Sequence, residues 1–163
     1  MKFGIYPNLG KKDLKMALER LTALLRDKNI DYSLPLSMKK GLMDMGFTED
    51  TYETDESMGK RDFILSVGGD GSFLGAARAF RDYPVLMAGL HLGDLGFLNS
   101  MTLRDMEKRV DQILSGDYQE EHRLYLSAAL IHGDGRKEKL PTVLNDVVIG
   151  HASIGQLARI RLF

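Results

Sequence analysis

The chain has 163 residues and no cysteine, and its 22 Lys and Arg residues nearly balance 23 Asp and Glu residues, giving a formal net charge of −1. This balance disfavours a nucleic-acid or anionic-membrane surface, because both require clustered positive charge. The lack of cysteine excludes disulfides and thiolate metal sites and favours a reducing compartment. No stretch approaches the roughly 18 apolar residues of a membrane span, and no signal segment follows Met1. Composition therefore predicts a cytoplasmic soluble protein with no nucleic-acid and no membrane partner.

The first sixty residues alternate strand and helix signals. Residues 2–6 form a short apolar run that the turn residues 7–10 end, which predicts a buried strand and a loop. Leucine and alanine recur at helical spacing between charged residues over 12–28, which predicts an amphipathic helix. The further expectations are a strand over 30–36, a weaker helix over 38–45 and an acidic surface loop over 48–61.

The next part of the chain repeats this alternation with glycine-rich strand ends. The apolar run 63–67 leads into Gly68-Gly69-Asp70-Gly71-Ser72 and then a helix face from 73 to 80. A second buried strand over 84–90 runs into the glycine-rich segment 91–99. Thr102 then resembles the N-cap of a helix over 103–114. Strands that alternate with helices predict an α/β fold, a Rossmann-like parallel sheet with helices on its faces.

After Gly116 the pattern changes to strands without helices. Strand-like runs occur at 125–131, 143–149 and 157–163, and His132 to Gly135 form a hairpin-type turn. We therefore expect an α/β nucleotide-binding domain over 1–118 and a truncated start of an all-β (β-sandwich) domain over 119–163. Two or three strands do not make a stable sheet domain alone. The isolated chain is expected to self-associate through residues 121–163, as a homo-oligomer, or to leave that segment poorly ordered.

The turn Gly68-Gly69-Asp70-Gly71-Ser72 suits a phosphate ligand. Glycines let backbone N–H groups approach a ligand closely, and the positive end of the following helix points to the same place. The alternative is a plain turn with Ser72 as N-cap, but three glycines exceed what one turn requires. Neither Gly-x-Gly-x-x-Gly nor a Walker-type loop is present. Asp70 in such a turn can act as a general base or help to place a metal-bound phosphate.

Three motifs carry a resemblance to a known family. Residues 68–74 resemble the Gly-Gly-Asp-Gly signature of NAD kinases, which diacylglycerol and sphingosine kinases and phosphofructokinases share more loosely. Residues 92–98 resemble the Leu-Gly-x-Leu-Gly-Phe-Leu segment of NAD kinases, where the lipid kinases carry Pro-x-Gly-Thr-x-Asn. Residues 144–149 are similar to the family's Asn-Glu/Asp dipeptide at the start of a strand. Their order over residues 63–149 indicates the NAD kinase family.

The resemblance implies an activity and roles for individual residues. NAD kinases transfer the γ-phosphate of ATP to the 2′-hydroxyl of the adenosine ribose of NAD, giving NADP, with Mg²⁺ or another divalent cation on the ATP phosphates. By resemblance, Asp70 is the general base and an NAD contact, and Gly71 also contacts NAD. Phe97 is similar to the family's aromatic near the adenine, and Asn145 and Asp146 to its NAD-binding pair.

Several alternatives remain open at this point. Asn145 and Asp146 could form only a polar turn before a strand, and Phe97 could be a core residue. The family's Thr-Gly-Ser-Thr-Ala-Tyr-like segment, which completes its NAD site, does not occur in the chain, so we expect the isolated chain to be inactive. A lipid kinase of the same superfamily and a non-catalytic nucleotide-binding module are the competing hypotheses.

The remaining charged and titratable residues are assigned no role in the site. The four histidines lack metal-ligand spacing, so no protein metal site is expected. Lys11-Lys12 and the run 137–139 are expected to be solvated surface, and Asp94 is expected to be structural. Gly75 occupies a position where many relatives have a basic side chain and others have glycine. The four histidines are His91, His122, His132 and His151.

Overall fold

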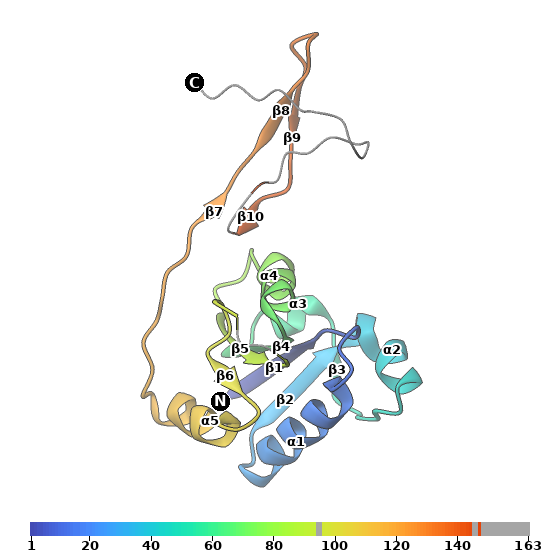
Figure 1. Cartoon of the computed structure of the whole chain (residues 1–163), viewed down its shortest axis with the longest axis vertical. Coiled ribbons are helices and arrows are strands. Elements are labelled where there is room, and N and C mark those ends of the chain that lie inside the picture. The colour runs from blue at the N-terminus through green and yellow to red at the C-terminus, as the bar shows by residue number, and fades with distance from the viewer. Residues whose placement is uncertain (94–95, 145–146, 148–163) are drawn as a thin grey trace. The chain divides into compact units, whose positions relative to one another are not determined.

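The computed structural model describes residues 1–93, 96–144 and 147, and the chain divides into two compact units, Met1–Glu121 and His122–Phe163. The first unit contains a six-stranded sheet in the order β3-β2-β1-β4-β5-β6, with every neighbouring pair parallel (Figure 1). Its strands are β1 (Lys2–Pro7), β2 (Asp31–Pro35), β3 (Tyr52–Glu53), β4 (Phe63–Gly68), β5 (Leu86–His91) and β6 (Met101–Thr102). The predicted α/β, Rossmann-like fold is confirmed.

Helices cover both faces of this sheet. They are α1 (Leu14–Asp27), the short 3₁₀ helix η1 (Leu36–Met38), α2 (Lys39–Asp44), α3 (Asp55–Met58), α4 (Asp70–Ala79) and α5 (Met106–Ser115). Alternate residues of β4 enter two separate clusters: Phe63 and Leu65 pack in the cluster of α1 and α5, whereas Ile64 packs with Met58 of α3 and with Phe80. Figure 1 shows α1 and α5 on one side of the sheet and α3 and α4 on the other. No helix in the described part of the chain is long and apolar enough to cross a membrane.

The elements with long apolar signals are those predicted from the sequence. Strands expected at 2–6, 30–36, 63–67 and 84–90 and helices expected at 12–28 and 38–45 are confirmed, with ends that differ by a few residues. The buried side chains of α1 explain its prediction, because they recur at intervals of three and four residues along one face. They are Leu14, Ala17, Leu18, Leu21, Thr22 and Leu25.

The prediction of a loop over 48–61 is wrong, since β3 and α3 lie there. β3 has two residues and α3 has four. Elements this short cannot show an apolar period, so the sequence pattern does not predict them. Local hydrogen bonding makes α3 instead: the backbone N–H of Ser57 donates to Thr54 Oγ1 at 3.3 Å in an N-cap. Met58, at the end of α3, is fully buried and anchors the segment.

Two expected helix caps are also wrong. Thr102 belongs to β6, and both its N–H and its Oγ1 donate to Asp105 Oδ1 at 2.6 Å, so α5 begins only after Asp105. Ser72 lies inside the first turn of α4, which begins at Asp70. The N–H of Gly69 donates to Ser72 Oγ at 3.1 Å. Both errors arise because a serine or threonine side chain can stabilise a turn from within it as well as from its first position.

The second unit contains short antiparallel pairs. β7 (Tyr125–Leu126) pairs with β10 (Val143–Leu144), and β8 (Ala129–Ile131) pairs with β9 (Lys137–Lys139). The hairpin predicted at 132–135 is confirmed, with the N–H of Gly135 donating to the carbonyl of His132 at 2.9 Å. The strand expected over 125–131 is interrupted at Ser127-Ala128. The strand expected over 157–163, and all but Val143, Leu144 and Val147 of the one over 143–149, lie outside the described residues.

Candidate active site

The strand order places a ligand crevice between β1 and β4. In doubly wound sheets, ligands bind at the carboxyl ends of the strands where the strand order reverses, and in this sheet that point lies between β1 and β4. The loop after β1 and the turn after β4 meet there. The N–H of Asn8 donates to the carbonyl of Val67 at 2.9 Å, and Asn8 Nδ2 donates to Ser72 Oγ at 2.8 Å. The glycine-rich turn therefore lies at the expected ligand position.

Glycine is present at the three positions of this turn for different reasons. Gly68 has a positive φ of 156°, and a side chain on it would collide with Ser72 Oγ, so the fold itself requires glycine there. A Cβ on Gly69 would have Lys11 Nζ as its nearest neighbour, at an ordinary 3.6 Å, and a Cβ on Gly71 would meet nothing within 4 Å. The fold does not require glycine at positions 69 and 71, and the space beside them is open to a ligand.

Asp70 is held by the segment that follows β5. Its Oδ2 accepts a hydrogen bond from the backbone N–H of Phe97 at 2.8 Å. Its Oδ1 accepts two, from the N–H of Leu98 at 3.1 Å and from Asn99 Nδ2 at 3.0 Å. The two sequence motifs that resemble one family are therefore in direct contact and form one site.

These hydrogen bonds fix the charge of Asp70. The Phe97 N–H, followed by the Leu98 N–H, the Asn99 amide and the nearby His91, holds the pKa of Asp70 below its ordinary value against the opposing effect of desolvation. A carboxylate offers about four acceptor positions, and three of them are occupied. Asp70 is thus an oriented anion with one acceptor position left, on Oδ2.

Small residues make room for this contact. A side chain on Gly96 would collide with the Asp70 carboxylate, and a side chain on Gly89 of β5 would collide with Asn99 Oδ1. Asn99 is only 5% exposed, so the packing around it holds its amide group in the orientation in which it donates to Asp70. The glycine before Phe97 in the second motif is therefore explained by the approach of Asp70.

The structure places only some of the other residues that were predicted for the site. Phe97 is 98% exposed, so the alternative that it is a core residue is wrong, and its ring is available to a ligand. Asn145, Asp146 and Asp94 lie outside the described residues. No cluster of three His, Asp or Glu side chains that could hold a metal ion occurs among the residues that the structure describes.

Four residues that the sequence did not single out for the site lie at it: Asn8, Lys11, His91 and Asn99. Lys11 was expected to be mere surface charge and His91 one of a scattered set. The sequence did contain one common feature of Asn8, Lys11 and His91, because each lies at or just after the carboxyl end of a predicted strand. The sequence does not give the strand order, and it is this order that brings the ends of β1, β4 and β5 together.

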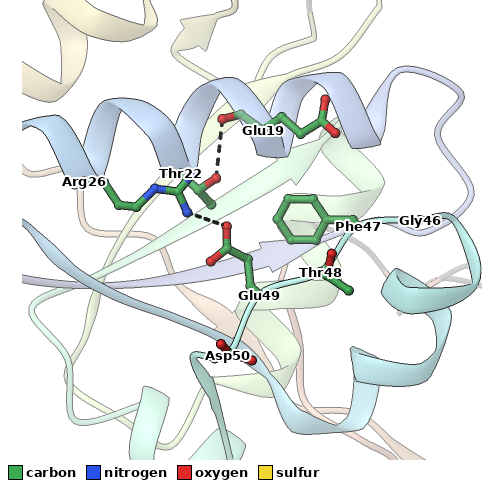
Figure 2. A pocket seen from close by; sticks show the side chains of 8 residues that line it. All are labelled: Glu19, Thr22, Arg26, Gly46, Phe47, Thr48, Glu49 and Asp50. Atoms are coloured by element: carbon green, nitrogen blue, oxygen red, sulfur yellow. Dashed lines mark hydrogen bonds and ion pairs between the residues drawn. The ribbon is translucent and has the colours of Figure 1, made fainter.

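A surface hollow of about 340 Å³ lies elsewhere, between α1 and the loop 46–50 (Figure 2). Its charged lining is mainly acidic, with Glu19, Glu49 and Asp50 against Arg26, and Arg26 already pairs with Glu49 Oε1 at 2.7 Å. This charge repels phosphate. None of the residues predicted for the site lines it. Those that do are Glu19, Thr22, Arg26, Gly46, Phe47, Thr48, Glu49 and Asp50.

A six-stranded parallel sheet in this order, with a glycine-aspartate turn and a helix N-terminus at the reversal point, defines a doubly wound α/β protein with a candidate ligand site at that point. The chain belongs to the NAD kinase family, because residues 3–118 match the model of the ATP-NAD kinase N-terminal domain.

Sequence relatives agree with this assignment. The chain is 34% identical to the NAD kinase of Teredinibacter turnerae over 162 residues, covering 98% of this chain and 54% of that protein. It is 30% identical to the NAD kinase of a Thermoanaerobacter species over 163 residues, covering 99% of this chain and 56% of that protein. The chain therefore spans about half the length of these relatives.

Solved structures share the fold. Yeast NADH kinase in complex with NADH aligns with a TM-score of 0.70 at 16% identity, covering 88% of this chain and 46% of that one. An NAD kinase from Archaeoglobus fulgidus in complex with ATP aligns with a TM-score of 0.55 at 19% identity, covering 88% of this chain and 45% of that one.

Proposed function

We propose that the protein to which this chain belongs is an NAD kinase, which transfers the γ-phosphate of ATP to the 2′-hydroxyl of the adenosine ribose of NAD. The observation that carries this proposal is the state of Asp70. It is an ionised, half-buried carboxylate at the reversal point of the sheet, with one acceptor position left free, next to the open side of Gly71 and the exposed ring of Phe97. A hydroxyl acceptor substrate fits this position.

In the proposed reaction the ribose 2′-oxygen attacks the γ-phosphorus while the bond from that phosphorus to the β,γ-bridging oxygen breaks, leaving ADP. The hydroxyl proton passes to Asp70 as general base. Because three N–H donors hold its pKa low, Asp70 is a weak base in the ground state. Its main contribution is to orient the hydroxyl for in-line attack, with proton transfer late in the step.

The rest of the turn binds phosphate in this proposal. The α4 N-terminus favours an anion, and Gly68, Gly69, Gly71 and Ser72 shape the approach to it. A Mg²⁺ ion carried on the ATP phosphates would neutralise the charge that develops during transfer. Phe97, Asn145 and Asp146 are proposed NAD contacts, by resemblance to the family.

We further propose that residues 1–118 are the nucleotide-binding domain and residues 119–163 the beginning of an all-β domain. We expect the isolated chain to be inactive, because it spans only about half the length of the NAD kinases that it matches. Leu124 is 87% exposed and Ile131 is 70% exposed, which supports self-association through residues 121–163 as a homo-oligomer. The cysteine-free sequence agrees with a cytoplasmic location.

The test is an acceptor comparison with the complete protein. Purified enzyme is incubated with ATP and Mg²⁺ and with NAD, diacylglycerol or sphingosine in parallel, and ADP and the phosphorylated acceptor are quantified. NAD as the only phosphorylated acceptor supports the proposal. Phosphorylation of a lipid, with NAD untouched, would establish the alternative of a lipid kinase, and no turnover with any acceptor would establish a binding module.

A further inference from the structure

His91 is a buried histidine without a hydrogen-bond partner at the candidate site. It is the last residue of β5, in register with Gly68 of β4, and it is only 7% exposed. Neither Nδ1 nor Nε2 has a hydrogen-bond partner within the described residues. Buried polar atoms in proteins are nearly always paired, so an imidazole without a partner among the described residues is a candidate to bind a ligand.

The ring of His91 is directed at the glycine turn. Its Cε1, the atom between the two ring nitrogens, lies 4.0 Å from the point where a Cβ on Gly69 would stand. This point is beside the N-terminus of α4, a helix of ten residues whose first N–H groups favour an anion.

Lys11 reaches the same point from another loop. Its Nζ lies 3.6 Å from the Cβ position of Gly69, and its backbone N–H donates to the carbonyl of Asn8 at 3.1 Å, which fixes the loop after β1. No carboxylate pairs with Lys11 among the described residues, whereas other basic side chains there, such as Arg26, Lys28 and Lys60, form ion pairs. The ammonium group is therefore available to an anionic ligand.

We propose that Lys11 and His91 bind one phosphate group of a nucleotide, seated over Gly69 at the N-terminus of α4. Lys11 supplies the positive charge and His91 a ring N–H donor. Gly69 leaves the space for the phosphate, which explains a glycine that the fold does not require. The assignment of the phosphate to a nucleotide rests on the proposed function, whereas the phosphate site itself does not.

The first experiment uses the complete protein and inorganic tripolyphosphate as the probe. The ring ¹⁵N signals of His91 are followed by NMR during the titration, and affinity is measured by calorimetry for wild type, Lys11→Met and the matched control Lys12→Met, since Lys12 is exposed on the same loop. We expect the His91 signals to shift and Lys11→Met to weaken binding about tenfold or more, the typical effect of losing a charge-assisted hydrogen bond. Lys12→Met should stay within about twofold of wild type.

The second experiment identifies the source of the phosphate. If it belongs to the donor, Lys11→Met raises the KM for ATP and leaves that for NAD unchanged; if it belongs to the dinucleotide, the reverse holds. His91→Asn keeps a donor and should bind tripolyphosphate better than His91→Phe, which keeps only the ring shape.

Unmoved His91 signals, together with equal affinities for Lys11→Met and Lys12→Met, would overturn the proposal, whatever the stability of the His91 variants. Tripolyphosphate binding that depends on Lys11 in a protein without NAD phosphorylation would support this phosphate site while rejecting the proposed function.

Discussion

The carboxylate of Asp70 and the backbone N–H of Phe97 are joined by a hydrogen bond of 2.8 Å, across 27 residues of sequence. This bond connects the turn after β4 with the loop between β5 and β6. It makes one unit of two motifs that the sequence presents separately. The unit fixes the carboxylate, and it presents the exposed Phe97 ring beside it. We therefore expect substitutions at Asp70 to change the geometry of this loop as well as the proposed chemistry.

Asp70→Asn is expected to lower kcat of the complete protein by about 10²-fold or more, because the amide cannot accept a proton. The NH₂ group of Asn is a donor, so it cannot replace the carboxylate oxygen that accepts from the Phe97 N–H or from the Leu98 N–H. The Kd for NAD should change much less than kcat. Asp82→Asn, at a carboxylate whose side chain is 80% exposed, is the matched control. A near-normal kcat in Asp70→Asn would remove Asp70 from the proposed role.

Asn99→Ala removes one of the three donors to Asp70, so we expect it to raise the pKa of Asp70 toward the ordinary value of about 3.9. In the wild type the folded-state pKa is the lower one. The stability this carboxylate contributes is therefore fully present above about pH 4 and is lost as pH falls through the lowered pKa. The ¹³C carboxyl signal of Asp70, titrated in both proteins, measures the shift. Equal midpoints would show that the Asn99 amide does not act on Asp70.

Gly71→Ala should change nucleotide affinity and folding stability in opposite directions. The added methyl group meets nothing within 4 Å and replaces glycine in the first turn of α4, so stability should rise by about 0.5–1 kcal/mol. Nucleotide affinity should fall, because the methyl group occupies the open space at the turn. Gly75→Ala in the same helix also has free space and serves as the control for the gain in helix propensity. Unchanged nucleotide affinity in Gly71→Ala would favour a plain turn.

Much of the site follows from local sequence, and the part that does not depends on strand order. The strand 63–67 and its glycine turn could be predicted because a continuous apolar run and three glycines are local signals. The bond from Asn99 to Asp70 and the approach of Lys11 to Gly69 could not be, since they require β1, β4 and β5 to be neighbours.

Leu124→Lys combined with Ile131→Lys tests the second unit. These side chains are 87% and 70% exposed, so the isolated chain should associate through them to remove apolar surface from water. Sedimentation velocity of the 163-residue chain should show oligomers for wild type and a shift toward monomer for the double variant. Glu120→Lys with Glu121→Lys, which adds positive charge nearby without removing apolar surface, is the control. A monomeric wild-type chain would contradict self-association through residues 121–163.

Arg61 holds the edge of the sheet through a bidentate ion pair with Glu53 of β3. Its Nη2 and Nε donate to Glu53 Oε1 and Oε2 at 2.7 and 3.0 Å, and its Nη1 donates to the carbonyl of Phe3 at 3.2 Å. Arg61→Met keeps the apolar stem but loses these bonds, and should lower the free energy of unfolding by about 1–3 kcal/mol. The loss is smaller than for a fully buried pair because the Glu53 side chain is 36% exposed and regains water.

The loss in Arg61→Met should also depend on pH. The guanidinium holds the pKa of Glu53 below its ordinary value, so the contribution of the pair is fully present above about pH 4.3 and is lost as pH falls through the lowered pKa. Urea unfolding at pH 7 and pH 3 should show a smaller difference between wild type and Arg61→Met at the lower pH. Lys60→Met, which breaks the exposed pair with Glu56, should change stability little at either pH. Equal effects of the two substitutions at pH 7 would mean that β3 is held by packing rather than by Arg61.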